Sequence, residues 1–178
     1  MPHNKIAFDW LESKVDLFKP TSSMLYVGWR SRSSMWWLDS FAPSIDCSCV
    51  GLVEAHKGNF LQFNREIRSK YLGRIEEVVK EFEVGEWDLL FWDHGPEHAE
   101  SETSLITATI EFKSIFNKIL YACPWGHCSN DASGNPHEKH GVTIYEETFK
   151  KMGLNVITFN KPDSNAKGEL IAWWEREK

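Results

Sequence analysis

The sequence predicts an α/β fold, in which a mostly parallel β-sheet carries helices on both faces and ends in an antiparallel hairpin. Short apolar runs alternate with stretches of helical periodicity along the 178 residues, a pattern typical of βαβ units. The run 89–92 is continuous and apolar between two aspartates, which indicates a buried central strand. The runs 154–159 and 170–174 are separated by a polar turn too short for a helical crossover, so we expect them to pair antiparallel.

The first 20 residues predict a helix that packs on the rest of the domain. Four apolar residues at spacings of four, four and three share one helical face, and Pro20 ends the pattern. These residues are Ala7, Leu11, Val15 and Phe18. We therefore divide the chain into an N-terminal helix, 1–20, and the main body of a single domain, 21–178.

The remaining elements follow from apolar runs and apolar stripes. The predicted parallel strands are 24–27, 49–53, 89–92 and 119–123. Helical stripes cover 37–41, 60–71 and 105–115, and residues 73–86 fit a helix better than a strand. Thr143 and Glu146 form a capping box for a last helix, which Gly153 is expected to end in the left-handed conformation.

Charge and cysteine content exclude several classes of protein. The net charge is -6 and the basic residues are scattered, so no basic stripe for a nucleic-acid backbone is present. Charged residues interrupt the N-terminal apolar pattern, so we expect neither a signal peptide nor a membrane span. The four cysteines are expected to be reduced thiols, and the protein is expected in the cytoplasm.

Polar residues follow the predicted central strand directly. These residues are Asp93, His94, Glu97 and His98. Packing in a core does not explain four polar groups directly after a buried strand. A histidine that titrates near neutral pH can act as a general base, so we take His94 as the base and Glu97 or His98 as the residue that orients it or the substrate. A purely structural alternative is that Pro96 begins a helix and the acids favour its dipole.

Gly28 and Glu54 stand at the predicted carboxyl ends of two strands, where an open α/β sheet binds its ligands. Glu54 follows Gly28 by 26 positions, which is close to the spacing between a glycine turn and a ribose-binding acid in dinucleotide folds. A carboxylate can accept hydrogen bonds from both ribose hydroxyls. The two residues therefore predict a site for a nucleotide-like ligand.

Several segments resemble class I S-adenosylmethionine-dependent methyltransferases, in the order in which that family carries them. The turn Tyr26-Val-Gly-Trp-Arg30 resembles the first cofactor loop, Glu54 the ribose-binding acid, and the segment from Asp88 to His98 the fourth-strand motif. The segments 123–126 and 134–140 are similar to a bacterial branch that carries His-Gly-Pro-Glu-His. The resemblance spans roughly residues 22 to 176.

This resemblance implies a Rossmann-like methyltransferase fold, S-adenosylmethionine as cofactor, and a small-molecule or sugar acceptor. The implied cofactor-binding residues are Gly28, Trp29, Glu54 and Asp93. The implied catalytic residues are His94, Glu97 and His98. Loops after neighbouring parallel strands emerge on the same side of a sheet, so we expect the long loop that holds Trp125, His137 and His140 to face residues 93–98 across one acceptor pocket.

Two alternatives remain open at this point. The family's cofactor loop carries two or three glycines, whereas this one carries only Gly28, so the fold could have been kept as a binding domain without catalysis. The second alternative is a metal-dependent enzyme, in which His94 and His98, with nearby acids and His137 or His140, hold a metal that activates water.

Overall fold

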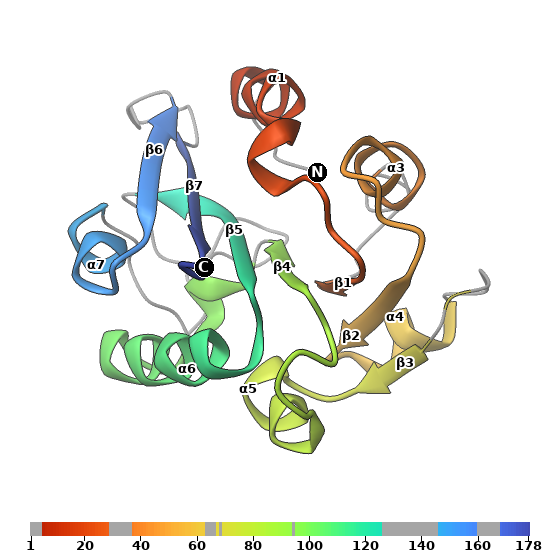
Figure 1. Ribbon diagram of the computed structural model, residues 1–178. Coiled ribbons are helices and arrows are strands. Elements are labelled where there is room, and N and C mark those ends of the chain that lie inside the picture. The colour runs from red at the N-terminus through yellow and green to blue at the C-terminus, as the bar shows by residue number, and fades with distance from the viewer. Residues whose placement is uncertain are drawn as a thin grey trace.

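A computed structural model of the protein describes residues 5–28, 37–62, 67, 69–93, 95–125, 146–159 and 168–178. In these ranges seven strands form one sheet in the order β3-β2-β1-β4-β5-β7-β6 (Figure 1). The strands are β1 (Met24–Val27), β2 (Val50–Glu54), β3 (Ser69–Leu72), β4 (Leu89–Asp93), β5 (Lys118–Trp125), β6 (Asn155–Phe159) and β7 (Gly168–Glu175). Strands β1 to β5 pair parallel, and β7 pairs antiparallel with both β5 and β6. The predicted parallel sheet with a terminal antiparallel hairpin is confirmed.

Helices cover both faces of the sheet, as the alternation of the sequence predicts. One face carries α1 (Lys5–Ser13), the 3-10 helix η1 (Val15–Phe18), the π-helical turn η2 (Trp37–Phe41) and α3 (Ala42–Ser44). The other face carries α5 (Ile75–Val78), the 3-10 helix η3 (Val79–Glu81), α6 (Glu102–Ile115) and α7 (Glu146–Lys151). Two short elements follow strand ends, namely α4 (Lys57–Gln62) after β2 and the 3-10 helix η4 (Pro96–His98) after β4.

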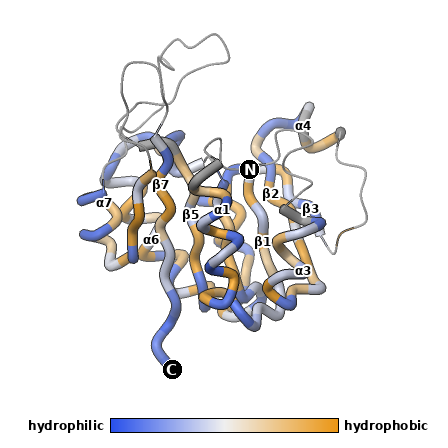
Figure 2. Tube along the Cα trace, turned by 90° about the horizontal axis from the view of Figure 1, so that it is seen from above, coloured by the Kyte–Doolittle hydropathy of each residue, from blue (hydrophilic) through white to orange (hydrophobic). Residues whose placement is uncertain are grey.

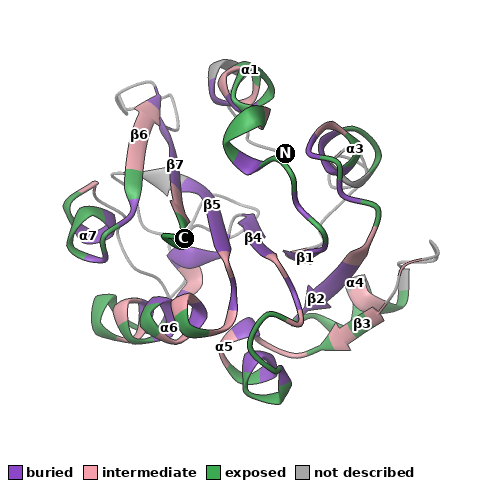
Figure 3. Cartoon of the chain, in the orientation of Figure 1, coloured by how far each residue is buried: buried purple, intermediate pink, exposed green. Residues whose placement is uncertain are grey.

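The central strand β4 separates two apolar cores, because successive side chains of a strand point to opposite faces. Leu90 and Trp92 join the core beneath α5, α6 and α7, whereas Leu89 and Phe91 join the core beneath α1 and α3. Every residue of β4 is buried, and hydrophobic residues concentrate along the strands (Figures 2 and 3). The prediction of a central strand at 89–92 is therefore confirmed, with Asp93 as its last residue.

The N-terminal helix packs against the antiparallel hairpin. The ring of Trp10 in α1 lies 5.9 Å from the ring of Phe159 in β6 and 5.2 Å from that of Trp173 in β7. The helical pattern predicted over 7–18 tightens into a 3-10 turn at Val15 before the chain reaches Pro20. No helix of the described ranges has the length and apolar character that crossing a membrane requires.

The helix predicted over 60–71 is wrong at its second half. Helix α4 ends at Gln62, and Tyr71 belongs to strand β3, which pairs parallel with β2. Strand β3 is an edge strand whose residues alternate between half-buried and exposed, so it lacks the continuous apolar run that marks the inner strands. The helical spacing of Phe60, Ile67 and Tyr71 is coincidental. Residues 75–81 are helical, as predicted.

The ends of the helices follow local chemistry. Gly153 adopts a φ of +75° two residues after the last residue of α7, which confirms the predicted left-handed end of that helix. Thr143, the predicted cap of the same helix, lies outside the described residues. Helix α6 begins with a capping box, in which the Ser101 hydroxyl accepts a hydrogen bond from the Ser104 backbone amide over 3.0 Å.

Candidate functional site

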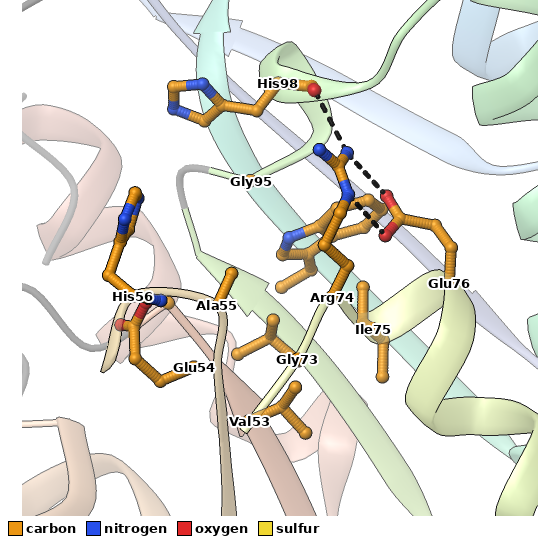
Figure 4. Close-up of a pocket in the computed structure, with 13 residues that line it drawn as sticks. Val53, Glu54, Ala55, His56, Gly73, Arg74, Ile75, Glu76, Gly95 and His98 are labelled. Carbon is orange, nitrogen blue, oxygen red and sulfur yellow. Dashed lines mark hydrogen bonds and ion pairs between the residues drawn. The ribbon is translucent and has the colours of Figure 1, made fainter. Parts of the chain in front are cut away.

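A cleft of about 430 Å³ opens at the carboxyl ends of the parallel strands (Figure 4). Its wall comes from the ends of β1, β2 and β4 and from the turns after β2, β3 and β4. The lining residues are Val27, Gly28, Val53, Glu54, Ala55, His56, Gly73, Arg74, Ile75, Glu76, Trp92, Gly95 and His98. The volume lies in the range of small-molecule sites, and the position is the one where open α/β sheets bind ligands.

Glu54 brings a carboxylate to this cleft as the last residue of β2. The residue is only 3% exposed, and Oε1 accepts a hydrogen bond from the backbone amide of His56 over 2.8 Å. This bond fixes the orientation of the carboxylate at the point where the chain leaves the strand. The structure thus lines the cleft with the acid that the sequence predicts as the ribose-binding residue.

Gly28 lies at the end of β1 and also lines the cleft. Its φ is +104°, and a Cβ atom there would lie 2.5 Å from the carbonyl oxygen of Asp93 on β4. The backbone amide of Gly28 donates a hydrogen bond to the carbonyl of Val53 over 3.2 Å. The close approach of two strand ends therefore requires a glycine here, whatever the cleft binds.

The turn after β3 supplies a wall of the cleft that the sequence analysis missed. Gly73 adopts a φ of +150°, and its amide donates to the carbonyl of Glu54 over 3.0 Å, which joins this turn to the end of β2. Arg74 and Glu76 follow and also line the cleft. If β3 is predicted as a strand, Gly73 marks the turn at its carboxyl end, and Arg74 and Glu76 become candidates for the site.

The end of β4 carries two buried acids from the predicted cluster. Asp93 is 3% exposed, and its Oδ2 accepts a hydrogen bond from the Tyr26 hydroxyl over 2.5 Å. Glu97 is also 3% exposed, and its Oε1 lies 3.8 Å from Nε2 of His98. Of these three predicted residues, only His98 lines the cleft.

Gly95 lies tightly against the indole of Trp92. A Cβ atom on this glycine would lie 1.5 Å from Nε1 of Trp92. Both residues line the cleft, so the glycine lets the backbone after β4 pass over the indole that forms part of the wall.

Other predicted site residues lie outside the described residues. These are Trp29, His94, His137 and His140. Trp125 ends β5, but its side chain is not described. The predicted acceptor pocket between residues 93–98 and the loop from Pro124 to His140 stays a prediction, although β4 and β5 are parallel neighbours and end at the same edge of the sheet.

The metal-dependent alternative also stays a prediction, because His94, His137 and His140 lie outside the described residues. Among the described residues, no group of three or more histidine, cysteine or acidic side chains could hold a metal ion. Cys123 is fully buried in β5, and its pKa is raised well above the ordinary thiol value, first by desolvation and then by the charges of Glu97, Glu169 and Asp93. Such a thiol stays protonated and is a poor metal ligand.

Comparison with solved structures places this geometry among known folds. A methyltransferase dependent on S-adenosylmethionine from Archaeoglobus fulgidus superposes with a TM-score of 0.63 and 14% identity, over 96% of this chain and 94% of that chain. A second such methyltransferase, from Mesorhizobium loti, gives a TM-score of 0.62 and 9% identity over 95% and 97% of the two chains. This chain has a Rossmann-like methyltransferase fold.

A third similar structure contains a cofactor product. The N-methyltransferase NodS from Bradyrhizobium japonicum WM9, in complex with S-adenosyl-L-homocysteine, gives a TM-score of 0.59 and 12% identity over 96% of this chain and 87% of that chain. No protein-family model matches the sequence, and no curated protein matches it. At these identities the methyltransferase likeness establishes the fold, and the activity is inferred from the site.

Proposed function

We propose that the protein is an S-adenosylmethionine-dependent methyltransferase that binds its cofactor in the cleft at the ends of β1, β2 and β4. The observation that carries the proposal is the buried carboxylate of Glu54, which lines a cleft of adenosine size in a methyltransferase fold. A carboxylate at the end of the second strand matches the chemistry of a ribose diol, which offers two hydroxyl donors.

The lining residues fit the rest of an adenosine group. Val27, Val53 and Ile75 supply apolar surface, and the Trp92 indole adds a flat aromatic group. A purine ring is planar and largely apolar on its faces, so such walls favour it over a sugar or a charged group. The cleft has this volume and an acid in its wall although the first loop has a single glycine, which supports a binding role over a fold without a ligand.

When bound, the cofactor would supply an activated methyl group, and the chain would have to hold an acceptor in line with it. We propose a small molecule or sugar as acceptor, with His94 as general base and with Glu97 and His98 as the residues that orient it. The 3.8 Å approach of Glu97 to His98 supports this pairing. Trp125, His137 and His140 are proposed to contact the acceptor, and Asp93 to contribute to the cofactor site.

We also propose a cytoplasmic location. Cys47 and Cys123, in the described part of the chain, are reduced thiols, and reduced thiols fit a reducing compartment. The scattered positive charge of the sequence supports a small-molecule acceptor over nucleic acid.

Isothermal titration with S-adenosylmethionine and S-adenosylhomocysteine tests the proposal. The wild-type chain should bind one molecule of either ligand. Glu54→Gln keeps the shape of the side chain but loses its charge, and should weaken binding roughly tenfold to a hundredfold, because hydrogen bonds to charged groups are worth about 1.5–3 kcal/mol. Glu111→Gln on α6, away from the cleft, should bind like the wild type.

Two results would overturn the proposal. Absence of binding by both ligands at millimolar concentration would favour a fold without catalysis. A zinc or iron content near one per chain in purified protein, without cofactor binding, would favour the metal-dependent alternative.

A further inference from the structure

Two turns that line the cleft come from strands that are not neighbours. In the sheet order, β2 and β1 stand between β3 and β4. Three strand spacings separate β3 from β4, about 14 Å at the level of the sheet. The turn after β3, residues 73–76 with the start of α5, and the turn after β4, residues 95–98 with η4, nevertheless meet across the cleft.

Arg74 makes the contact between these turns. Its Nη2 donates to the carbonyl oxygen of His98 over 3.2 Å and to Oε1 of Glu76 over 3.3 Å. Its Nε donates to Oε2 of Glu76, also over 3.3 Å. Figure 4 shows Glu54 and His56 on one side of the cleft and Arg74 and Glu76 on the other, with the carbonyl of His98 pointing at the guanidinium group.

We infer that Arg74 is a positioning residue. It links the two turns and so sets the width of the space in which the adenine ring of the proposed ligand lies. The inference rests on the proposed adenosine ligand. Glu76 holds the guanidinium by a two-point contact through Nε and Nη2, and a second N–H of Nη2 reaches the carbonyl of His98. A planar guanidinium can do both, whereas a lysine ammonium cannot reproduce the two-point contact.

The contact should matter more for binding than for folding. The side chains of Arg74 and Glu76 are 39% and 25% exposed, and ion pairs with this much access to solvent add little to global stability. An arginine is charged throughout the usual pH range, and the hydrogen bond to Glu76 raises the pKa of Arg74 further. A cleft whose walls are fixed before binding avoids the ordering that binding otherwise requires.

Titration with S-adenosylhomocysteine and with 5′-methylthioadenosine tests the inference on the full chain. Arg74→Gln and Glu76→Gln should each weaken both ligands about tenfold, and the double variant no more than Arg74→Gln alone, because the two residues act as one unit. Arg74→Lys should fall between the wild type and Arg74→Gln. The melting temperatures of these variants should stay within about 2 °C of the wild type.

Arg176→Gln is the matched control. Like Arg74, Arg176 donates to the backbone through Nη2, here to the carbonyls of Lys113 and Phe116, but it lies outside the cleft and should leave affinity unchanged. If the wild type binds and Arg74→Gln binds equally well, or if the two substitutions add, the positioning role is wrong while the proposed function stands. If the wild type binds neither ligand, both proposals fail.

Discussion

The Tyr26 hydroxyl donates a 2.5 Å hydrogen bond to Oδ2 of Asp93, across the pair formed by β1 and β4. Both residues are buried, and they point to the face of the sheet that α1 and α3 cover. The same strand ends approach again where the carbonyl of Asp93 faces Gly28. The carboxyl ends of β1 and β4 are thus locked together directly beside the cleft.

Replacing Tyr26 by Phe should lower the free energy of unfolding by about 1.5–3 kcal/mol, because it removes a buried hydrogen bond to a carboxylate. Tyr121→Phe is a matched control, since Tyr121 is equally buried but pairs with the neutral Thr109 hydroxyl over 2.8 Å. That bond should contribute only about 1 kcal/mol. Urea denaturation of both variants compares them, and equal losses would contradict the stronger hydrogen bond assigned to the Tyr26–Asp93 pair.

Replacing Gly28 by Ala should destabilise the chain by about 1–3 kcal/mol, since the added methyl meets the Asp93 carbonyl and the positive φ disfavours alanine. Gly58→Ala on α4 serves as the control, because a Cβ there meets nothing within 4 Å. The control should change stability by less than about 1 kcal/mol, in the stabilising direction. Thermal denaturation of both variants measures this, and equal melting temperatures would contradict the close approach.

Cys123 should resist alkylation in the folded protein, because burial raises its pKa and keeps the thiol protonated. Iodoacetamide at pH 8 should modify Cys123 only after urea is added, as tandem mass spectrometry would detect by separating modification at Cys123 from modification at Cys128 of the same tryptic peptide. Rapid labelling without denaturant would show that this end of β5 opens to solvent.

The raised pKa of Cys123 also predicts how the free energy of unfolding changes with pH. The folded state holds the thiol proton more tightly than the unfolded chain, so this contribution is complete below the ordinary value of 9.0 and declines as the pH rises above it. The free energy of unfolding should therefore fall between pH 8 and pH 10 in the wild type, and fall less in Cys123→Ala. An identical fall in both proteins would assign the effect to other groups.

The strands that are buried on both faces of the sheet were predictable, because their sequences are continuous apolar runs. Strands β1 and β4 follow such runs, and the final hairpin follows from a turn too short for a helix. Strand β3 was not predictable in this way, because one side of an edge strand is free of the sheet and its residues alternate in exposure. Its Tyr71 packs on Phe82 and so lent a false apolar position to a helical pattern.

The candidate site was predictable only in part. Gly28 and Glu54 stand at strand ends that the sequence marks clearly, and both line the cleft. Arg74 and Glu76 escaped notice because the strand before them was assigned as helix. The role of Gly28 in the approach of β1 to β4 depends on strand pairing, which one sequence does not reveal.

A crystal structure of the chain with S-adenosylhomocysteine tests the central claim most directly. We predict that both ribose hydroxyls lie within about 3.2 Å of the Glu54 carboxylate, a normal hydrogen-bond distance, with the adenine beside the Arg74 turn. A ligand bound elsewhere, with the cleft between Glu54 and Arg74 filled only by water, would contradict the claim.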